Sequence, residues 1–335
     1  MARPRAGDIG ERGLIEMIWD LVDRELPGSK SGSALPHPDD ASAVTLPDGR
    51  YLVLKTDMFV RRTDAPRGMR HSQMGRKSVV MCASDLAAKG AKPHAFMHSM
   101  GVPPGYRPGR VMELMRGVLS ACKDYGMSFL GGDLGESKDL IVAGVAVGFA
   151  DRIVRRSGAL PGDLLAVTGP FGDTASAFEI LLKGRSAPAP LRRRLLRSVY
   201  HPRARVDLGV ALAGTGAVTS SMDSSDGLAF TLHELARSSG VRLLLSKVPV
   251  SSAAEEFASI HQIPAEDLAL YGGEEYEIVL TIKPEALDMA QLAAARCGSR
   301  LLLIGRVEEG RGVALSDGSV ERPIEAKGWE HLRHP

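Results

Sequence analysis

Short apolar segments rich in strand-forming residues alternate with segments of helical period along most of this chain. In the first half, this pattern predicts a helix at 13–26, strands at 51–56, 96–102, 128–130 and 140–150, and helices at 75–90 and 111–125. Strands separated by helices are typical of an α/β or α+β domain, which here would cover roughly residues 35–150.

A second alternation of the same kind begins after a turn at 160–163. It predicts strands at 164–168, 242–245 and 276–282 and helices at 172–182, 204–214 and 228–238. With 335 residues, the chain is long enough for two domains of ordinary size. We therefore expect an N-terminal α/β domain of residues 1–152 and a C-terminal α/β domain of residues 153–335.

Charge and composition argue against several classes of function. Forty-two Lys and Arg against 40 Asp and Glu, with only 5% aromatic residues, argue against a nucleic-acid-binding protein. Because no apolar stretch reaches the ~18–20 residues of a membrane span, we expect no membrane association. The three cysteines, Cys82, Cys122 and Cys297, are widely spaced, which favours reduced thiols, and the N-terminal residues lack the apolar core of a secretory signal. A cytoplasmic protein is therefore expected.

Aspartates stand beside small or turn-forming residues at the expected ends of several elements. They are Asp40, Asp57, Asp85, Asp133, Asp223 and Asp226. Carboxylates are oxygen ligands suited to Mg²⁺, which in turn bridges phosphates. The chain lacks both the P-loop and the G-x-G-x-x-G patterns, so nucleotide would be bound through metal ions, with Gly131 and Gly132 letting backbone amides approach phosphate oxygens. A single aspartate is better explained by a cap or a turn than by a site, and only the whole series indicates a site.

In order and context, these segments resemble the thiamine-monophosphate kinase family, a part of the superfamily that includes aminoimidazole ribonucleotide synthetase. The matching segments include Asp39-Asp-Ala-Ser-Ala-Val, Lys55-Thr-Asp-Met, Val79-Val-Met-Cys-Ala-Ser-Asp-Leu-Ala-Ala-Lys-Gly, Gly131-Gly-Asp, Met222-Asp-Ser-Ser-Asp-Gly-Leu, Gly272-Gly-Glu-Glu-Tyr-Glu and Lys327-Gly-Trp-Glu-His. The resemblance implies a two-domain α/β fold like that of aminoimidazole ribonucleotide synthetase. It also implies a homodimer in which the N-terminal domains pair into a β-barrel.

The resemblance further implies ATP-dependent phosphorylation of thiamine monophosphate to thiamine diphosphate, by direct in-line transfer assisted by several Mg²⁺ ions. Carried over by position, the Mg²⁺ ligands would be Asp40, Thr56, Asp57, Asp85, Asp133, Asp223 and Asp226, with Asp85, Asp133 and Asp226 as catalytic residues. The ATP contacts would be Gly132, Asp133, Arg156 and Ser225, and the thiamine side would be lined by Asp64, Glu274 and Trp329. Because the acceptor is an ionised phosphate, such a reaction needs positioning and charge neutralisation more than a strong general base.

Three positions depart from the family pattern, and the first is Pro38, which precedes Asp39-Asp40 where the family usually has Gly. Lys55 stands where the family often has Ser or Thr, and its ammonium would either replace the charge of one metal ion or point away. Asp64 stands where the family commonly has a histidine on the substrate side. Two alternatives therefore stay open: a related kinase or synthetase with another small phosphate or amide acceptor, and a nucleotide-binding regulator without catalysis.

Overall fold

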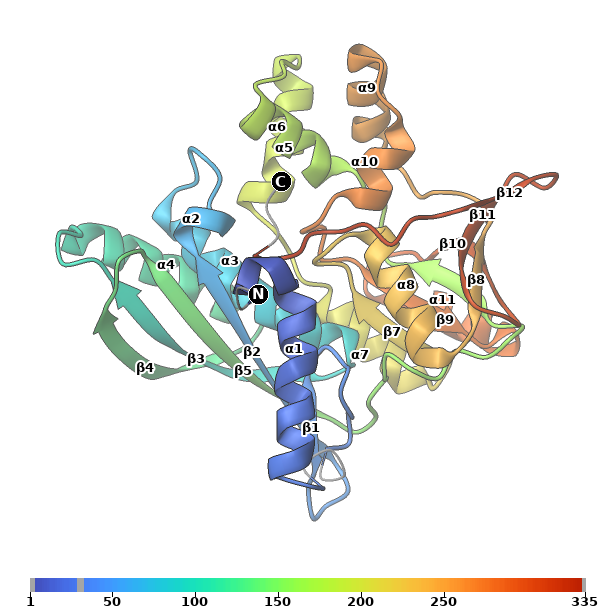
Figure 1. Cartoon of the computed structure of the whole chain (residues 1–335), viewed down its shortest axis with the longest axis horizontal. Helices are drawn as coiled ribbons and strands as arrows, with labels where there is room; N and C mark the ends of the chain where they lie inside the picture. Colours follow the sequence, from blue (N-terminus) through green and yellow to red (C-terminus); the bar gives the residue numbers. More distant parts are fainter. Residues whose placement is uncertain (1–3, 29–32, 333–335) are drawn as a thin grey trace.

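The strands form two separate sheets, one in each lobe of the molecule (Figure 1). The computed structural model describes residues 4–28 and 33–332. The first sheet has the order β1-β2-β5-β3-β4 and consists of β1 (Ser42–Thr45), β2 (Tyr51–Val60), β3 (Lys92–Val102), β4 (Ser128–Glu136) and β5 (Ile141–Ala150). Strands β3 and β4 pair in parallel and the other neighbours pair antiparallel. Buried and half-buried residues alternate along β5, as in a strand with one face packed on a core.

Two helices, α3 (His71–Ala88) and α4 (Pro108–Asp124), pack against each other, and α3 lies against β2, β5 and β3. The two helices approach closely because glycines lie between them. A Cβ on Gly75 would be 2.0 Å from the carbonyl oxygen of Leu114, and one on Gly117 would be 1.8 Å from that of Ser72. Helix α3 also contacts α7 (Val206–Thr215) and β7 (Val218–Asp223) of the second lobe. It is therefore buried on almost all sides and joins the two lobes.

The opposite face of the five-stranded sheet carries apolar side chains that remain exposed. Val44 on β1, Met58 on β2 and Met97 on β3 expose 43%, 54% and 41% of their surface. Val145 on β5 pairs with Met97 and is only half-buried. An apolar sheet face of this kind is characteristic of an interaction surface.

The second sheet has seven strands in the order β12-β11-β8-β10-β6-β9-β7. Besides β7 these are β6 (Leu164–Val167), β8 (Arg242–Leu245), β9 (Ile278–Ile282), β10 (Leu302–Glu308), β11 (Gly312–Ser316) and β12 (Glu321–Pro323). Helix α8 (Leu228–Ser239) contacts β7, β8, β9 and β11 and covers one face. The remaining helices of this lobe are α5 (Asp173–Lys183), α6 (Ala189–Tyr200), α9 (Ser252–His261), α10 (Ala265–Tyr271) and α11 (Leu287–Arg296), with a short 3₁₀ helix at Pro284–Ala286.

The N-terminal helix α1 (Ala6–Glu25) lies across the front of the molecule in Figure 1 and contacts the C-terminal lobe. The guanidinium of Arg12 lies 3.8 Å from the ring centroid of Phe230 on α8. The carboxylate of Glu11 accepts a hydrogen bond of 3.0 Å from the backbone N–H of His331, in the C-terminal segment. Both ends of the described chain therefore meet beside α8.

The expected arrangement of two α/β lobes is confirmed. Several elements were not expected from the sequence, among them β1, β7, β10, β11, β12, α9, α10 and α11, and the expected elements differ at their ends. Strand β4 does not stop at residue 130: it continues to Glu136, because residues 132–136 pair in parallel with β3, and Gly131-Gly132-Asp133 therefore lies inside a strand. Strand β9 begins at Ile278, two residues later than expected, because Glu274 and Tyr276 have positive φ angles of 66° and 54°.

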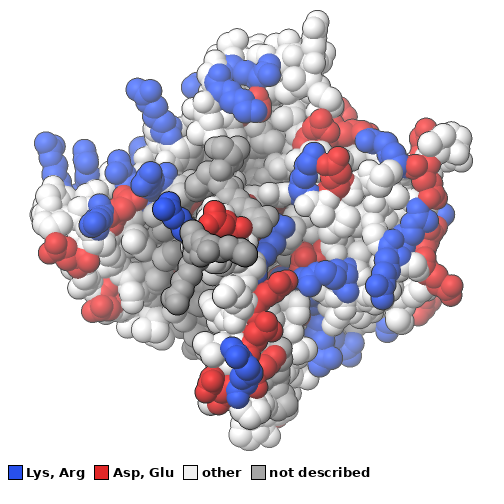
Figure 2. Space-filling view, in the orientation of Figure 1, with Lys and Arg blue, Asp and Glu red and all other residues white. Residues whose placement is uncertain are grey.

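Basic and acidic side chains are interspersed on the face shown in Figure 2, in keeping with the formal net charge of +2. Among the described residues, no helix combines the length and apolar character needed to cross a membrane.

Candidate active site

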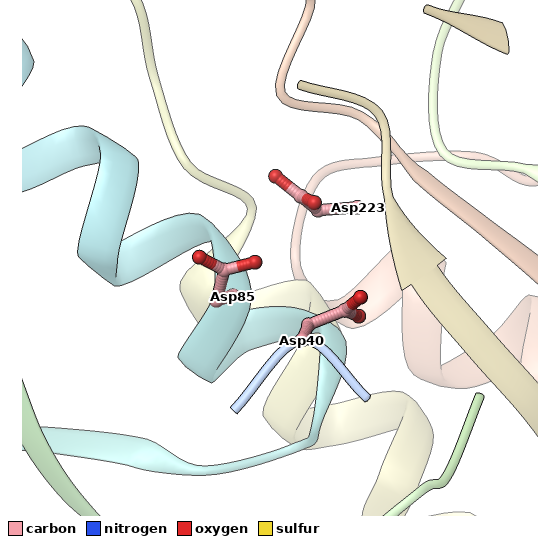
Figure 3. Close-up of side chains that lie close together, drawn as sticks. All are labelled: Asp40, Asp85 and Asp223. Carbon is pink, nitrogen blue, oxygen red and sulfur yellow. The ribbon is translucent and has the colours of Figure 1, made fainter. Parts of the chain in front are cut away.

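Three buried carboxylates from three distant segments meet between the two lobes (Figure 3). Asp40 lies in the loop before β1, Asp85 in the last turn of α3, and Asp223 at the end of β7. One oxygen from each lies within 4.8 Å of the others, and the residues are only 7%, 5% and 2% exposed. The burial of α3 between the lobes is what brings Asp85 next to a residue from each of them.

Each of the three carboxylates has a different set of partners. The Lys55 ammonium lies 2.8 Å from Asp85 Oδ2. Asp40 lies 2.9 Å from Lys89 Nζ and accepts a 2.6 Å hydrogen bond from the Arg156 guanidinium. Asp223 accepts from hydroxyl groups, those of Ser84 at 2.9 Å and Ser225 at 3.4 Å. Positive charge is therefore concentrated on Asp40 and Asp85.

The pKa values follow this uneven distribution. Burial disfavours ionisation of Asp40, but the nearby Lys89 and Arg156 outweigh it and lower its pKa to about 2. For Asp223, burial and the negative charge of Asp40 raise the pKa to about 6. Burial also raises the pKa of Asp85 well above its usual value, even though the adjacent Lys55 acts in the opposite direction. Burial therefore favours the protonated forms of Asp85 and Asp223, and a bound cation would favour their ionised forms.

The donor set fits a divalent cation. All three side chains offer hard carboxylate oxygens, the ligands that Mg²⁺ takes in proteins. The Oδ2 atom of Asp40 is buried and has the Lys89 ammonium 2.9 Å away, and a carboxylate oxygen can accept from more than one partner. Asp40, Asp85 and Asp223 could therefore hold Mg²⁺.

Two further predicted ligands lie beside this centre. Asp57 stands two residues after Lys55 on β2, so both side chains point to the face that carries α3. Asp226 follows β7 by three residues, and burial together with the negative charges of Asp223 and Glu11 raises its pKa to about 7. Thr56 points to the opposite face of the sheet, where its hydroxyl donates to the carbonyl of Gly144 at 3.0 Å.

Gly132 and Asp133 lie away from the carboxylate centre. They are exposed residues of β4, which is the edge strand and is separated from β2 by β5 and β3. Three strand spacings amount to about 14 Å. Asp133 pairs with Ser99 in a row that continues to Ala143 and Met58, and its side chain therefore belongs to the exposed apolar face of the sheet. Within one chain, the fold does not bring Asp133 to Asp85.

Residues predicted on the substrate side gather around the turn at Ser225 and Asp226. The backbone N–H of Glu274 donates to the carbonyl of Ser225 at 2.7 Å, and that of Trp329 donates to the carbonyl of Asp226 at 3.0 Å. The Trp329 side chain remains 45% exposed. The Glu274 carboxylate is bound at 2.5 Å by the ammonium of Lys77, which is only 1% exposed. Glu274 and Trp329 thus lie beside the carboxylate centre.

Asp64 and Arg156 already have protein partners. The Asp64 carboxylate is buried and accepts a 2.6 Å hydrogen bond from the backbone N–H of Val60, across the short helix α2 (Arg61–Asp64). Arg156 contacts Asp40 and, at 3.1 Å, Glu234 of α8. The side chain of Arg156 is therefore next to the carboxylate centre, whereas the carboxylate of Asp64 is turned toward its own backbone.

Three cations and a hydroxyl have roles at the centre that were not predicted from the sequence. Lys55 was noted with its orientation open, and the structure directs it to Asp85. Lys77 on α3 and Lys89 just after it are almost fully buried. Lys77 forms an ion pair with Glu274, and Lys89 forms ion pairs with Asp39 and Asp40. Ser84 binds Asp223 from α3. The sequence carries no clear signal for Lys77 and Lys89, because α3 contains other polar residues and the partners of both lysines lie far away in the sequence.

The fold and the acidic centre together define a class of proteins. The family model described as AIR synthase related protein, N-terminal domain, matches residues 38–150, and the corresponding C-terminal domain model matches residues 161–318. The thiamine-monophosphate kinase of Nitrosopumilus maritimus is 38% identical, covering 84% of this chain and 89% of its own. That of Pyrococcus horikoshii is 37% identical over 88% of this chain and 90% of its own.

Among solved structures, AaThiL complexed with AMPPCP and TMP has a TM-score of 0.85 and 28% identity, and the match covers 99% of this chain and all of that one. The thiamine monophosphate kinase of Aquifex aeolicus has a TM-score of 0.77, with 91% and 96% coverage. The chain belongs to the thiamine-monophosphate kinase family.

Proposed function

We propose that this chain transfers the terminal phosphoryl group of ATP to the phosphate of thiamine monophosphate, giving thiamine diphosphate and ADP. The observation that carries the proposal is the meeting of Asp40, Asp85 and Asp223 between the lobes (Figure 3). It is supported by membership of the kinase family and by a relative complexed with AMPPCP, an ATP analogue, and TMP. In the reaction, an oxygen of the acceptor phosphate bonds to the γ-phosphorus while the bond from that phosphorus to the ADP oxygen breaks.

The buried carboxylates supply the electrostatic part of this proposal. Asp40, Asp85 and Asp223 would hold a shared Mg²⁺ centre, with Asp57 and Asp226 beside them. Bound Mg²⁺ neutralises phosphate charge, so that two polyanions can approach in line. The acceptor oxygen is already ionised and needs no proton removed, and the carboxylates therefore act by positioning charge and not as general bases.

The substrate side lies around residues 225–226. The exposed indole of Trp329 offers a surface on which a cationic thiazolium ring can stack. Glu274, fixed by Lys77 and by the Ser225 carbonyl, presents a carboxylate on the same side. Arg156 and Ser225 lie beside Asp40 and Asp223 and are the proposed nucleotide contacts from this chain.

Gly132 and Asp133, the other proposed nucleotide contacts, would act from a second copy of the chain. They lie on a strand whose exposed face includes the apolar side chains of Met58 and Met97, so pairing of two such sheets into a barrel would cover this surface. A partner's β4 would then lie at the interface, close to the site that its neighbour's Asp85 helps to build. This arrangement supports the proposed homodimer.

The activity is tested by measuring ADP release with Mg²⁺, ATP and thiamine monophosphate, and by detecting thiamine diphosphate directly. Wild type should release ADP only when thiamine monophosphate is present. Asp85→Asn removes one carboxylate from the centre and should lower kcat by about 10²–10³-fold, the usual effect of losing one electrostatic contact to the transition state. Asp20→Asn, on the exposed side of α1, is the control and should leave kcat unchanged.

Three outcomes would contradict the proposal in different ways. ADP release that depends on another small phosphate or amide acceptor, and not on thiamine monophosphate, would identify a related kinase or synthetase. Nucleotide binding without turnover would indicate a regulator. Full activity in a folded Asp85→Asn protein would leave the reaction intact but contradict the assignment of the carboxylate centre.

A further inference from the structure

Lys55 is a cation built into the carboxylate centre. Its ammonium lies 2.8 Å from Asp85 Oδ2, and its side chain is 22% exposed. Lys55 stands on β2, where it pairs with Ala146 of β5, directly after the four residues of β2 that also pair with β1. Asp85 lies within 4.8 Å of both Asp40 and Asp223. The ammonium therefore occupies one side of the same group of oxygens that could hold a metal ion.

The charges around the centre are not evenly placed. Asp40 has Lys89 and Arg156, and Asp85 has Lys55, whereas the described partners of Asp223 are hydroxyl groups. Two positive ions held by one carboxylate repel each other strongly when the site is poorly solvated. A divalent ion at the same oxygen of Asp85 would have to displace Lys55 or share that oxygen with it. The side of the centre near Asp223 has no such competing cation among the described residues.

We propose that Lys55 takes the place of one divalent cation at Asp85, so that the carboxylate centre binds one metal ion fewer than its carboxylates alone would bind. The inference rests on the proposed function, because it concerns the metal centre of that reaction. The inference goes beyond the proposed function because it assigns to this chain a lysine that acts as a fixed cation. Lys55 is thus a positioning residue, acting through Asp85.

The test is the number of Mn²⁺ ions bound per chain. Metal-free protein is titrated with Mn²⁺ in the absence of ATP and thiamine monophosphate, and electron paramagnetic resonance measures the Mn²⁺ that stays free. Lys55→Thr should bind one more Mn²⁺ per chain than wild type. Lys55→Arg keeps the charge and should bind the same number as wild type. Lys138→Thr, which removes an exposed lysine elsewhere, is the matched control and should also behave as wild type.

A second variant guards against misfolding. Lys55→Gln keeps most of the side-chain length without the charge and should also bind one additional ion. Equal Mn²⁺ stoichiometry in wild type and in the folded uncharged variants would overturn the proposal, as would a gain in Lys55→Arg. Because the titration uses neither substrate, its failure would leave the kinase assay unaffected. Conversely, if wild type has no kinase activity while the uncharged Lys55 variants still bind one more Mn²⁺ than wild type, that result would contradict only the proposed function.

Discussion

Asp223 is buried and Asp226 is half-buried, and the ionisation of both carboxyl groups opposes folding when no metal is bound. In the unfolded chain they release their protons near pH 4, whereas in the folded chain their pKa values are about 7 and about 6, because burial and neighbouring negative charges favour the protonated form. Between these values the folded state binds more protons than the unfolded state. The stability of the metal-free protein should therefore fall as the pH rises from about 4 to about 7.

Asp226→Asn should remove much of this slope. At pH 7 without metal, the variant should unfold at a higher temperature than wild type, by an amount corresponding to up to about 4 kcal/mol, since each pKa unit is worth about 1.4 kcal/mol. Adding Mg²⁺ should raise the melting temperature of wild type more than that of the variant. Thermal unfolding followed by circular dichroism between pH 4 and 8 measures both effects. An unchanged slope in Asp226→Asn, with Asp20→Asn as control, would show that the carboxyl of Asp226 does not oppose folding.

Lys77 is a second buried charge, and its removal should be costly for a different reason. Its ammonium donates to Glu274 Oε1 at 2.5 Å and to the Asp64 carbonyl at 2.8 Å. Lys77→Met leaves both acceptors without this partner and should cost about 3 kcal/mol, the low end for breaking a buried pair, because Glu274 stays 25% exposed. If Glu274 contacts substrate, the KM for thiamine monophosphate should rise as well.

An exposed ion pair of the same type provides the comparison for Lys77. Lys183 is 67% exposed and lies 2.6 Å from Glu179, four residues earlier on α5. Lys183→Met should change stability by no more than about 0.5 kcal/mol. Chemical denaturation of the two variants gives the two free energies. Equal losses would show that burial is not what makes the Lys77 contact important.

At the scale of elements, the close contact between α3 and α4 depends on glycine. A Cβ at Gly117 would lie 1.8 Å from the carbonyl oxygen of Ser72, and backbone cannot move away as a flexible side chain can. Gly117→Ala should therefore destabilise the protein by at least about 1–3 kcal/mol, the range for overpacking. Gly109, also on α4, has open space around its Cβ position, so Gly109→Ala should be neutral or slightly stabilising. The denaturation midpoints of the two variants test whether the helix–helix contact, and not helix propensity, decides if the substitution destabilises or stabilises the protein.

The helices and strands also differ in how well the sequence predicts them. Helix and strand periods identified α3, α4, β2 and β5, because each buries one face or all faces and carries the matching apolar pattern. The end of β4 was missed, since it is set by pairing with β3, and no local pattern encodes a partner 34 residues away along the chain. Lys77 and Lys89 were missed as site residues for the same reason: their carboxylate partners are distant in sequence.

Among the candidate site residues, the sequence series brought Asp40, Asp85 and Asp223 to attention, and the structure gathers them. The series could not tell which face of a strand a residue occupies. Thr56 and Asp57 are adjacent in sequence and point to opposite faces of β2, and Asp133 belongs to the exposed face of the sheet. The side of the sheet that a residue faces and its pairing register depend on how all strands pair. The positions of these residues could therefore be assigned only from the fold.

At the scale of the whole molecule, the question is whether one chain contains a complete site. Asp85 lies between the lobes, and Asp133 lies about 14 Å from β2 across three strand spacings, on the uncovered face of the sheet. If both residues are needed for one reaction, Asp133 must come from a second copy. The oligomeric state and the activity are then linked, and a monomer should be inactive.

Mixed dimers of two inactive variants test this link. Asp85→Asn and Asp133→Asn should each abolish most activity alone. When equal amounts are unfolded, mixed and refolded together, random pairing makes half of the dimers mixed, and in each mixed dimer one site combines an intact Asp85 with the partner's intact Asp133. About a quarter of the wild-type activity should therefore return. If both residues instead served the same site from the same chain, every site would lack one of them, and mixing would restore nothing. Sedimentation of the refolded mixture shows that dimers have formed, so that an absence of recovery counts against donation between subunits and not against refolding.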